Sequence, residues 1–381
     1  MKREDPRPEE YLYWKQLMKH LKRNYRDEST FFNVNFVYPR QLEIHLPGDH
    51  KRACDLACSH CAGRYFIKTL GNWELDALEL LNNLKGRIPF HIYGGAYTEP
   101  LINPYYLTFL ATTKKYNNHF GIHTNGTLLK ALEENQGWLT ELNRISTDRT
   151  DYLSVSIDAG LSTEWAISKG ANDHVWFWRI LDGLEKAVKI RDKAGKGHSI
   201  RVCYLISEIC SSDEHFENIV EFAKGARVDS LRFSIPFAHY KRNFHDVRQY
   251  KKNVEEYNDD RYYNRLSQYL SKSKDEKPYI FYTGPEFTDI DKFTFSECIY
   301  GYYQITLGAD GYLYKCSTTA TPTAKHCRLG KITSNLAEFK KAIQSNYNPD
   351  WDCQKECFNN ALRCNRMGLE INRRYDETRN R

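Results

Sequence analysis

Three cysteines at short intervals carry the clearest chemical signal in this chain. Cys54, Cys58 and Cys61 lie in the segment ACDLACSHCAGRYF, with the spacing C-x3-C-x2-C. A closed zinc site or a complete iron–sulfur site takes four ligands. Three thiolates can therefore belong to an incomplete zinc site. Alternatively, they can hold a [4Fe–4S] cluster whose fourth iron stays open to a substrate.

A second group of cysteines lies near the C-terminus, where six of the 11 fall between residues 298 and 381. The six are Cys298, Cys316, Cys327, Cys353, Cys357 and Cys364. The segment ITLGADGYLYKC leading into Cys316 predicts a β-hairpin with GADG as its turn. This density of thiols predicts a separate, metal-organised module, which can hold an iron–sulfur cluster or zinc.

The composition is that of an ordinary globular protein, with 41% hydrophobic and 27% charged residues. The N-terminal segment MKREDPRPEEYLYWKQ has no apolar signal region, and no apolar run approaches the ~18 residues of a membrane span. We therefore expect a cytoplasmic protein with no membrane partner, in which the cysteines are metal ligands or buried thiols rather than disulfides. The net charge of +6 is modest, so a nucleic-acid partner is not expected.

Short apolar runs alternate with helix-like segments through the first two thirds of the chain. The candidate strands cover 41–46, 89–95, 119–126, 151–158, 199–206 and 230–237. Helix-like segments such as 73–86, 105–116 and 215–226 lie between them. This alternation predicts an α/β fold, a partial (β/α)6 parallel barrel, with its chemistry at the carboxyl ends of the strands.

Four regions follow from these patterns. Residues 1–40 form an N-terminal helical extension and residues 41–237 form the partial barrel. The polar, basic and aromatic range 238–297 is predicted to be a helical connection or linker. Residues 298–381 form the cysteine-rich module.

The C-x3-C-x2-C spacing directly after the first strand resembles the radical S-adenosylmethionine superfamily. This resemblance implies that Cys54, Cys58 and Cys61 are the catalytic cluster ligands and that S-adenosylmethionine chelates the fourth iron. The segments YGGAYTEPL, HTNGTLL and SVSIDAG then match the motifs of the next three strand ends. The residues that the resemblance implies in cosubstrate binding are His60, Gly94, Gly95, Glu99, Thr124, Asn125, Ser156, Asp158 and Arg201.

The C-terminal module resembles the SPASM and Twitch extensions of the same superfamily. The resemblance implies at least one auxiliary [4Fe–4S] cluster. Its implied ligands are Cys298, Cys316, Cys353 and Cys357, with Cys327 unligated. Cys364 could replace Cys357, or Cys357 and Cys364 could both serve a second, incompletely ligated cluster. A zinc site made from the same thiolates is the alternative.

The implied activity is reductive cleavage of S-adenosylmethionine to a 5′-deoxyadenosyl radical that abstracts hydrogen from a substrate. The enzyme would then be an oxidoreductase that takes electrons from a donor such as flavodoxin or ferredoxin. Oxidative modification or crosslinking of a peptide is the expected reaction. Oxidation of a sugar, an aminocyclitol or another small molecule is the alternative, and a non-catalytic iron–sulfur or zinc protein is the alternative of another class.

Overall fold

A parallel β-sheet organises the part of the chain that the computed structural model describes. The described residues are 38–48, 53–59, 61, 73–95, 98–234, 261–283, 303–314, 317, 320 and 328–345. The sheet has ten strands in the order β10-β9-β8-β1-β2-β3-β4-β5-β6-β7, and β1 to β7 pair in parallel. These seven are β1 (Gln41–Ile44), β2 (Phe90–Tyr93), β3 (His119–Thr124), β4 (Tyr152–Ser156), β5 (Ser199–Leu205), β6 (Ser230–Ser234) and β7 (Tyr279–Thr283). The predicted α/β class is confirmed.

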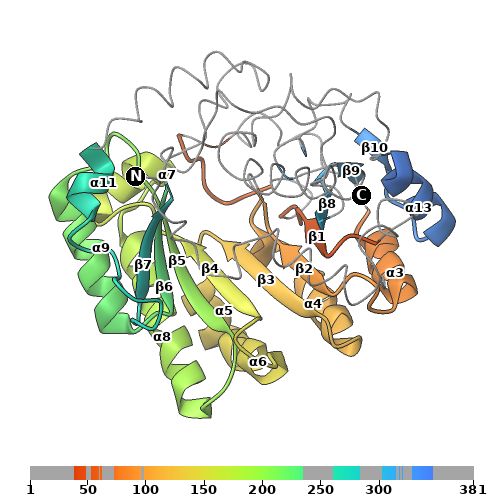
Figure 1. Ribbon diagram of the computed structural model, residues 1–381, viewed down its shortest axis with the longest axis horizontal. Coiled ribbons are helices and arrows are strands. Elements are labelled where there is room, and N and C mark those ends of the chain that lie inside the picture. Colours follow the sequence, from red (N-terminus) through yellow and green to blue (C-terminus); the bar gives the residue numbers. More distant parts are fainter. Residues whose placement is uncertain are drawn as a thin grey trace, which may run out of the picture.

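Helices connect successive strands and lie along the outer side of the curved sheet (Figure 1). They are α3 (Glu74–Leu84), α4 (Tyr106–Lys115), α5 (Leu129–Gln136), α6 (Trp138–Ile145), α7 (Ser162–Lys169), α8 (Val175–Ala194) and α9 (Asp213–Ala226). Three more described elements are the short 3-10 helix η3 (Pro100–Ile102), α11 (Arg261–Leu266) and α13 (Leu336–Ser345). Among the described helices, none is long and apolar enough to cross a membrane.

Alternation along the strands divides the sheet into an apolar and a polar face. On β4, Leu153 and Val155 are fully buried in the main apolar core that the helices share. The residues between them point to the opposite face because successive strand side chains alternate. Tyr152 and Ser154 therefore lie on the inner, concave face, as do Arg201 on β5 and Glu43 on β1. The inner face thus carries these polar groups beside an apolar cluster of Phe90 and Ile92 with the Tyr152 ring.

The predicted hairpin around the GADG turn is confirmed. β8 (Gln304–Leu307) and β9 (Tyr312–Tyr314) pair antiparallel, and β10 (Arg328–Lys331) extends the pair. β8 also pairs in parallel with β1, so the hairpin continues the barrel sheet. At the turn, Gly311 has φ +77 and packs so closely on Trp73 that an added Cβ would lie 2.7 Å from its Cδ1. Trp73 Nε1 donates to the Ala309 carbonyl at 2.9 Å, which fixes α3 against the turn.

One strand lies where the sequence pattern predicted a linker. β7 (Tyr279–Thr283) falls inside the range 238–297 and pairs in parallel with β6. Its sequence YIFYT has the aromatic and β-branched residues that favour strands. The strand is only five residues long and follows a long polar segment, which concealed its local pattern. The parallel sheet therefore continues beyond the six expected strands.

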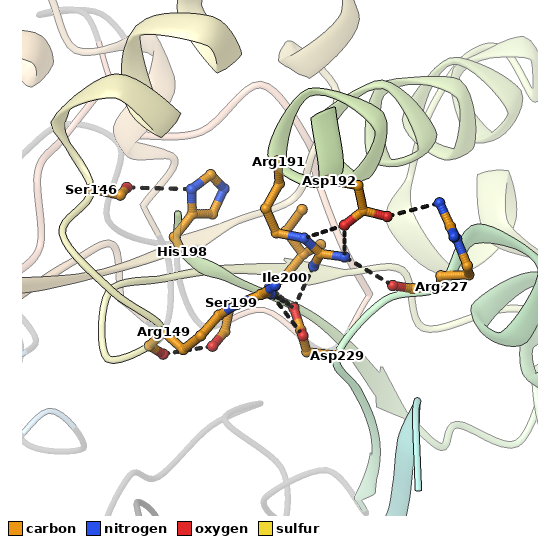
Figure 2. Close-up of polar contacts among 9 residues, drawn as sticks. All are labelled: Ser146, Arg149, Arg191, Asp192, His198, Ser199, Ile200, Arg227 and Asp229. Carbon is orange, nitrogen blue, oxygen red and sulfur yellow. Dashed lines mark hydrogen bonds and ion pairs between the residues drawn. The ribbon is translucent and has the colours of Figure 1, made fainter. Parts of the chain in front are cut away.

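A charged cluster closes the amino-terminal ends of β5 and β6 (Figure 2). The Arg191 guanidinium at the end of α8 contacts Asp229 at 2.5 Å and Asp192 at 2.8 Å. Asp229 also accepts a hydrogen bond from the backbone amide of Ile200 at 2.8 Å and pairs with Arg149 at 2.9 Å. These contacts tie α8 to the strand ends that lie away from the cysteine loop.

Candidate active site

The cysteine loop follows β1, as predicted, and begins at the carboxyl edge of the sheet. Cys54, Cys58 and Cys61 are each partly exposed and unlinked by disulfides. The Ala53 carbonyl accepts a hydrogen bond from the Glu99 amide at 2.9 Å, which anchors the start of the loop to the segment after β2. The Cys61 amide donates to the Cys58 carbonyl at 3.1 Å, which makes a tight turn between the last two cysteines.

The middle of the loop docks on the C-terminal end of α7. The Ala57 amide donates to the Lys169 carbonyl at 3.1 Å, and the Ser59 amide donates to the Ser168 carbonyl at 2.9 Å. Carbonyls in the last turn of a helix have no partner inside the helix, so the loop satisfies them. Gly170 has φ +60 and permits the approach, because a Cβ there would lie 2.4 Å from the Ala57 carbonyl oxygen.

The thiols of this loop are poor acids without a positive partner. Burial raises the pKa of Cys54 well above its usual range, and the charges of Glu99 and Asp55 raise it further. Burial also raises the pKa of Cys58, to about 11, although the ammonium of Lys169 opposes the shift. A bound metal deprotonates its thiol ligands and supplies the missing positive charge. The donor set therefore fits a thiolate-ligated metal group.

Three thiols on one loop can serve as ligands of an iron–sulfur cluster. Across the described ranges, no three His, Cys, Asp or Glu side chains are placed to share one ion. In a [4Fe–4S] cluster each thiolate binds a different iron, so the sulfurs need not converge on one point.

The tip of β3 is bound to the cysteine loop through Asn125 and Asp55. Asn125 Nδ2 donates to the Asp55 carboxylate at 2.7 Å and approaches Cys54 Sγ at 3.6 Å. Thr127 Oγ1 donates to the other Asp55 oxygen at 2.5 Å. Sequence reasoning missed Asp55 and Thr127, although Asp55 adjoins Cys54 and Thr127 lies two residues after Asn125. Together they determine where Cys54 lies relative to the third strand.

Glu99 binds the tip of β3 from the side of β2. Its carboxylate accepts hydrogen bonds from Thr124 Oγ1 at 2.7 Å, the Asn125 amide at 2.7 Å and the Leu101 amide at 3.1 Å. Burial raises the pKa of Glu99 to about 8, with the nearby charge of Asp55 as a further cause. Both oxygens are engaged by the protein, so the described contacts give Glu99 a role in positioning the strand ends. Its predicted contact with an ammonium group stays a prediction.

The glycine pair after β2 gives the backbone room to approach its neighbours. A Cβ on Gly94, whose φ is +95, would lie 2.2 Å from the His123 carbonyl oxygen. A Cβ on Gly95 would lie 2.0 Å from the His45 ring. His45 is fully buried and its Nε2 lies 2.8 Å from Glu43 Oε1, so this ring is held in place. Any larger residue at either position would displace the strand ends around the site.

Ser156 and Asp158 lie at the carboxyl end of β4, but they have different surroundings. Ser156 is the last strand residue and is partly exposed. Asp158 lies beyond the strand with φ +62 and is buried, with one oxygen accepting the Leu205 amide at 2.8 Å. Its other oxygen pairs with the buried ammonium of Lys169. The predicted contact between Asp158 and the cosubstrate therefore stays a prediction, and Ser156 has the more accessible side chain.

Arg201 lies on the inner face, nearer the start of its strand. Its guanidinium stacks 4.0 Å from the centroid of the Tyr152 ring. Tyr152 OH lies 2.8 Å from Nε2 of His123, whose side chain is exposed. Gly121 makes space for the Tyr152 ring, because a Cβ there would lie 2.2 Å from Cζ. This aromatic and cationic group borders the inner face below the strand ends.

The structure thus brings one predicted subset into a single hydrogen-bonded network. Cys54, Glu99, Thr124 and Asn125 are joined directly or through Asp55. Arg201 belongs to the separate Tyr152 group. Several predictions fall outside the described residues, namely those for His60, Cys298, Cys316, Cys327, Cys353, Cys357 and Cys364.

Comparison with known proteins supports the fold. The structure of Streptococcus suis SuiB bound to S-adenosylmethionine matches with TM-score 0.56 and 16% identity, over 88% of this chain and 72% of that one. SuiB bound to the precursor peptide SuiA matches with TM-score 0.52 and 16% identity, over 88% of this chain and 68% of that one. These matches confirm the predicted fold.

A curated relative is similar over part of the chain. It is the tungsten-containing aldehyde ferredoxin oxidoreductase cofactor-modifying protein of Pyrococcus furiosus, 26% identical over 175 residues. The match covers 45% of this chain and 44% of the relative, so the chain spans less than half the length of this relative. No known family profile matches the chain.

Proposed function

We propose that this protein is a radical S-adenosylmethionine enzyme. The observation that carries the proposal is the three-thiol loop at the carboxyl edge of a parallel sheet, bonded to the tip of β3 through Asn125. A metal-stapled binding protein needs the thiols, but it does not need glycine-lined strand ends beside them. The match to SuiB in its S-adenosylmethionine-bound form supports the same conclusion for the fold.

The residues at the strand ends would have different roles in binding the cluster and the cosubstrate. Cys54, Cys58 and Cys61 would hold the cluster. The backbone at Gly94 and Gly95 would accept the cosubstrate amino group, since only glycine allows a ligand and His45 to approach the same backbone. When bound, the cluster would supply the electron that cleaves S-adenosylmethionine and generates the hydrogen-abstracting 5′-deoxyadenosyl radical.

The strand ends and the inner face would complete the site. Ser156 offers a hydroxyl to the cosubstrate at the end of β4. The Tyr152, His123 and Arg201 group would line the substrate space below the cosubstrate. The buried network of Glu99, Thr124, Asn125 and Asp55 would keep the cysteine loop and strand tips rigid, because correct placement of the reacting atoms dominates such catalysis.

We propose an oxidative modification of a peptide as the reaction. The structure of SuiB with its precursor peptide supports this substrate class, since this chain shares the SuiB fold. Modification of a small-molecule cofactor is the second candidate, and the similarity to the cofactor-modifying protein of Pyrococcus furiosus favours it. In either case an external donor such as flavodoxin or ferredoxin would supply the electron. The C-terminal cysteines would hold at least one auxiliary [4Fe–4S] cluster.

An anaerobic assay tests the core of this proposal. The reconstituted protein is given dithionite and S-adenosylmethionine, and 5′-deoxyadenosine is quantified together with iron, sulfide and zinc. We expect 5′-deoxyadenosine from the wild type and none from a variant in which Cys54, Cys58 and Cys61 are replaced by Ala. That variant should keep the iron bound by the C-terminal cysteines. Product formation by the triple variant, or a wild type that holds zinc and forms no product, would refute the assignment.

A further inference from the structure

The end of α7 brings a buried positive charge to the cysteine loop. Lys169 is 2% exposed, although lysine is seldom buried without a partner. Its ammonium pairs with Asp158, and its backbone carbonyl accepts the Ala57 amide at 3.1 Å. The residue before it, Ser168, binds the Ser59 amide in the same way at 2.9 Å. The two loop residues that dock on α7 are therefore the immediate neighbours of Cys58.

The Lys169 ammonium acts on the cysteine sulfurs as well as on Asp158. The charges of Cys58 and Lys169 influence each other, and Cys54 contributes a weaker effect on the lysine. Burial alone lowers the pKa of Lys169, but Asp158 and the two cysteines raise it by more. A buried charge such as that of the Lys169 side chain acts more strongly than the same charge in water.

This placement has a consequence for electron uptake. Reduction adds one negative charge to an iron–sulfur cluster, and a fixed cation beside a thiolate ligand stabilises that added charge. Asp158 opposes the effect, since its carboxylate pairs with the same ammonium. Its backbone, with φ +62 at a non-glycine residue, and its bond from the Leu205 amide hold the carboxylate in that position. Lys169 and Asp158 together therefore influence the electrostatic potential near Cys58.

We propose that Lys169 is a positioning residue that raises the reduction potential of the cluster held by Cys54, Cys58 and Cys61. This inference rests on the proposed function, because it requires an iron–sulfur cluster on that loop. Lys169 would act through the thiolate ligands of the cluster. Asp158 limits the effect by partly neutralising the ammonium.

The test is a redox titration followed by electron paramagnetic resonance, without S-adenosylmethionine and with dithionite as the reductant. The variant lacking the three loop cysteines supplies the spectrum of any other cluster, which is subtracted. We expect Lys169→Met to lower the ratio of reduced to oxidised cluster at least tenfold at a fixed potential. That change corresponds to a shift of about 59 mV for a one-electron couple.

Three variants separate the charge effect from packing. Lys169→Arg keeps the charge and should stay within threefold of the wild type. Asp158→Asn keeps an acceptor for Leu205 but removes the negative charge, so it should shift the ratio in the opposite direction. Lys189→Met, at an exposed lysine of α8, should change nothing.

Each outcome decides the inference. A potential that is unchanged in Lys169→Met, or that falls equally in Lys169→Arg, overturns it while leaving the proposed function intact. If Lys169→Met assembles no cluster, an unchanged potential in Asp158→Asn overturns it and an upward shift supports it. A wild type whose loop holds no iron–sulfur cluster overturns both the inference and the proposed function.

Discussion

Asp151, at the start of β4, should contribute stability that depends on pH. The side chain is fully buried, and its two oxygens accept several hydrogen bonds. The donors are the Lys114 ammonium at 2.9 Å, the Thr147 amide at 2.9 Å, the Phe120 amide at 3.0 Å and His119 Nδ1 at 3.3 Å. Burial by itself raises the pKa of Asp151, but these donors outweigh it and lower the pKa from 3.8 to about 2.

The magnitude follows from that shift. One pKa unit corresponds to about 1.4 kcal/mol, so the ionised carboxylate adds roughly 2 kcal/mol to the free energy of unfolding. Because the pKa is lower in the folded state, this stability is present above pH 4 and disappears as the pH falls towards 2. Asp151→Asn also points an amide N–H at backbone donors. This mismatch destabilises the folded state by about a further 1–3 kcal/mol at every pH.

The assay is urea unfolding of the cluster-free protein, followed by circular dichroism, at pH 7 and at pH 3. Cluster-free protein is used because acid destroys iron–sulfur clusters. We expect Asp151→Asn to lower the free energy of unfolding by about 4 kcal/mol at pH 7, and clearly less at pH 3. Glu141→Gln, at an exposed carboxylate of α6, is the matched control and should change stability little. An equal loss for Asp151→Asn at both pH values would refute the reasoning.

Three site substitutions give further predictions. Gly95→Ala places a methyl group 2.0 Å from the His45 ring and should abolish S-adenosylmethionine binding in equilibrium dialysis. The control Gly225→Ala, where an added Cβ meets nothing within 4 Å, should bind normally. Equal binding by both variants would contradict the close approach at Gly95. Glu99→Ala leaves three donors without their acceptor and should lower the free energy of unfolding by about 3 kcal/mol. A loss below about 1 kcal/mol would rule out the proposed positioning role. Thr127→Val keeps the side-chain shape but removes the 2.5 Å hydrogen bond to Asp55. The iron bound per chain after reconstitution should therefore fall while the fold persists. Iron content equal to that of the wild type would show that Asp55 holds the loop without the Thr127 hydroxyl.

The sequence predicted the barrel strands well because each combines a short apolar run with a helix-like segment that follows. The cysteine loop after β1 and the GADG hairpin were also predictable, since spacing and turn residues determine them locally. β7 was not predictable from periodicity, because five residues in a polar region give too short a pattern. The strand is defined by its pairing with β6, which is a tertiary contact.

The site was predictable only at residues that belong to local motifs. Gly94 and Gly95 were identified from a glycine pair, and the reason for each glycine appears only in the backbone and ring that approach it. Lys169 gave no local signal, because its relation to Cys58 depends on how the cysteine loop docks on α7. Glu99 was predicted to accept from the ammonium of the cosubstrate, which stays a prediction. Its positioning contacts with Thr124, Asn125 and Leu101 appear only in the fold.

The parallel pair of β1 with β8 restricts how this chain can be divided. The His45 amide, at the start of the segment leading to the cysteine loop, donates to the Leu307 carbonyl at 2.9 Å, and the Gln304 side chain reaches Glu43. Removing the chain from residue 298 onward would turn β1 into an edge strand with exposed backbone groups, a template for aggregation. The C-terminal range therefore covers the β1 edge of the barrel sheet, in addition to carrying the second group of cysteines. A domain swap between related enzymes should therefore exchange β1 and β8 together.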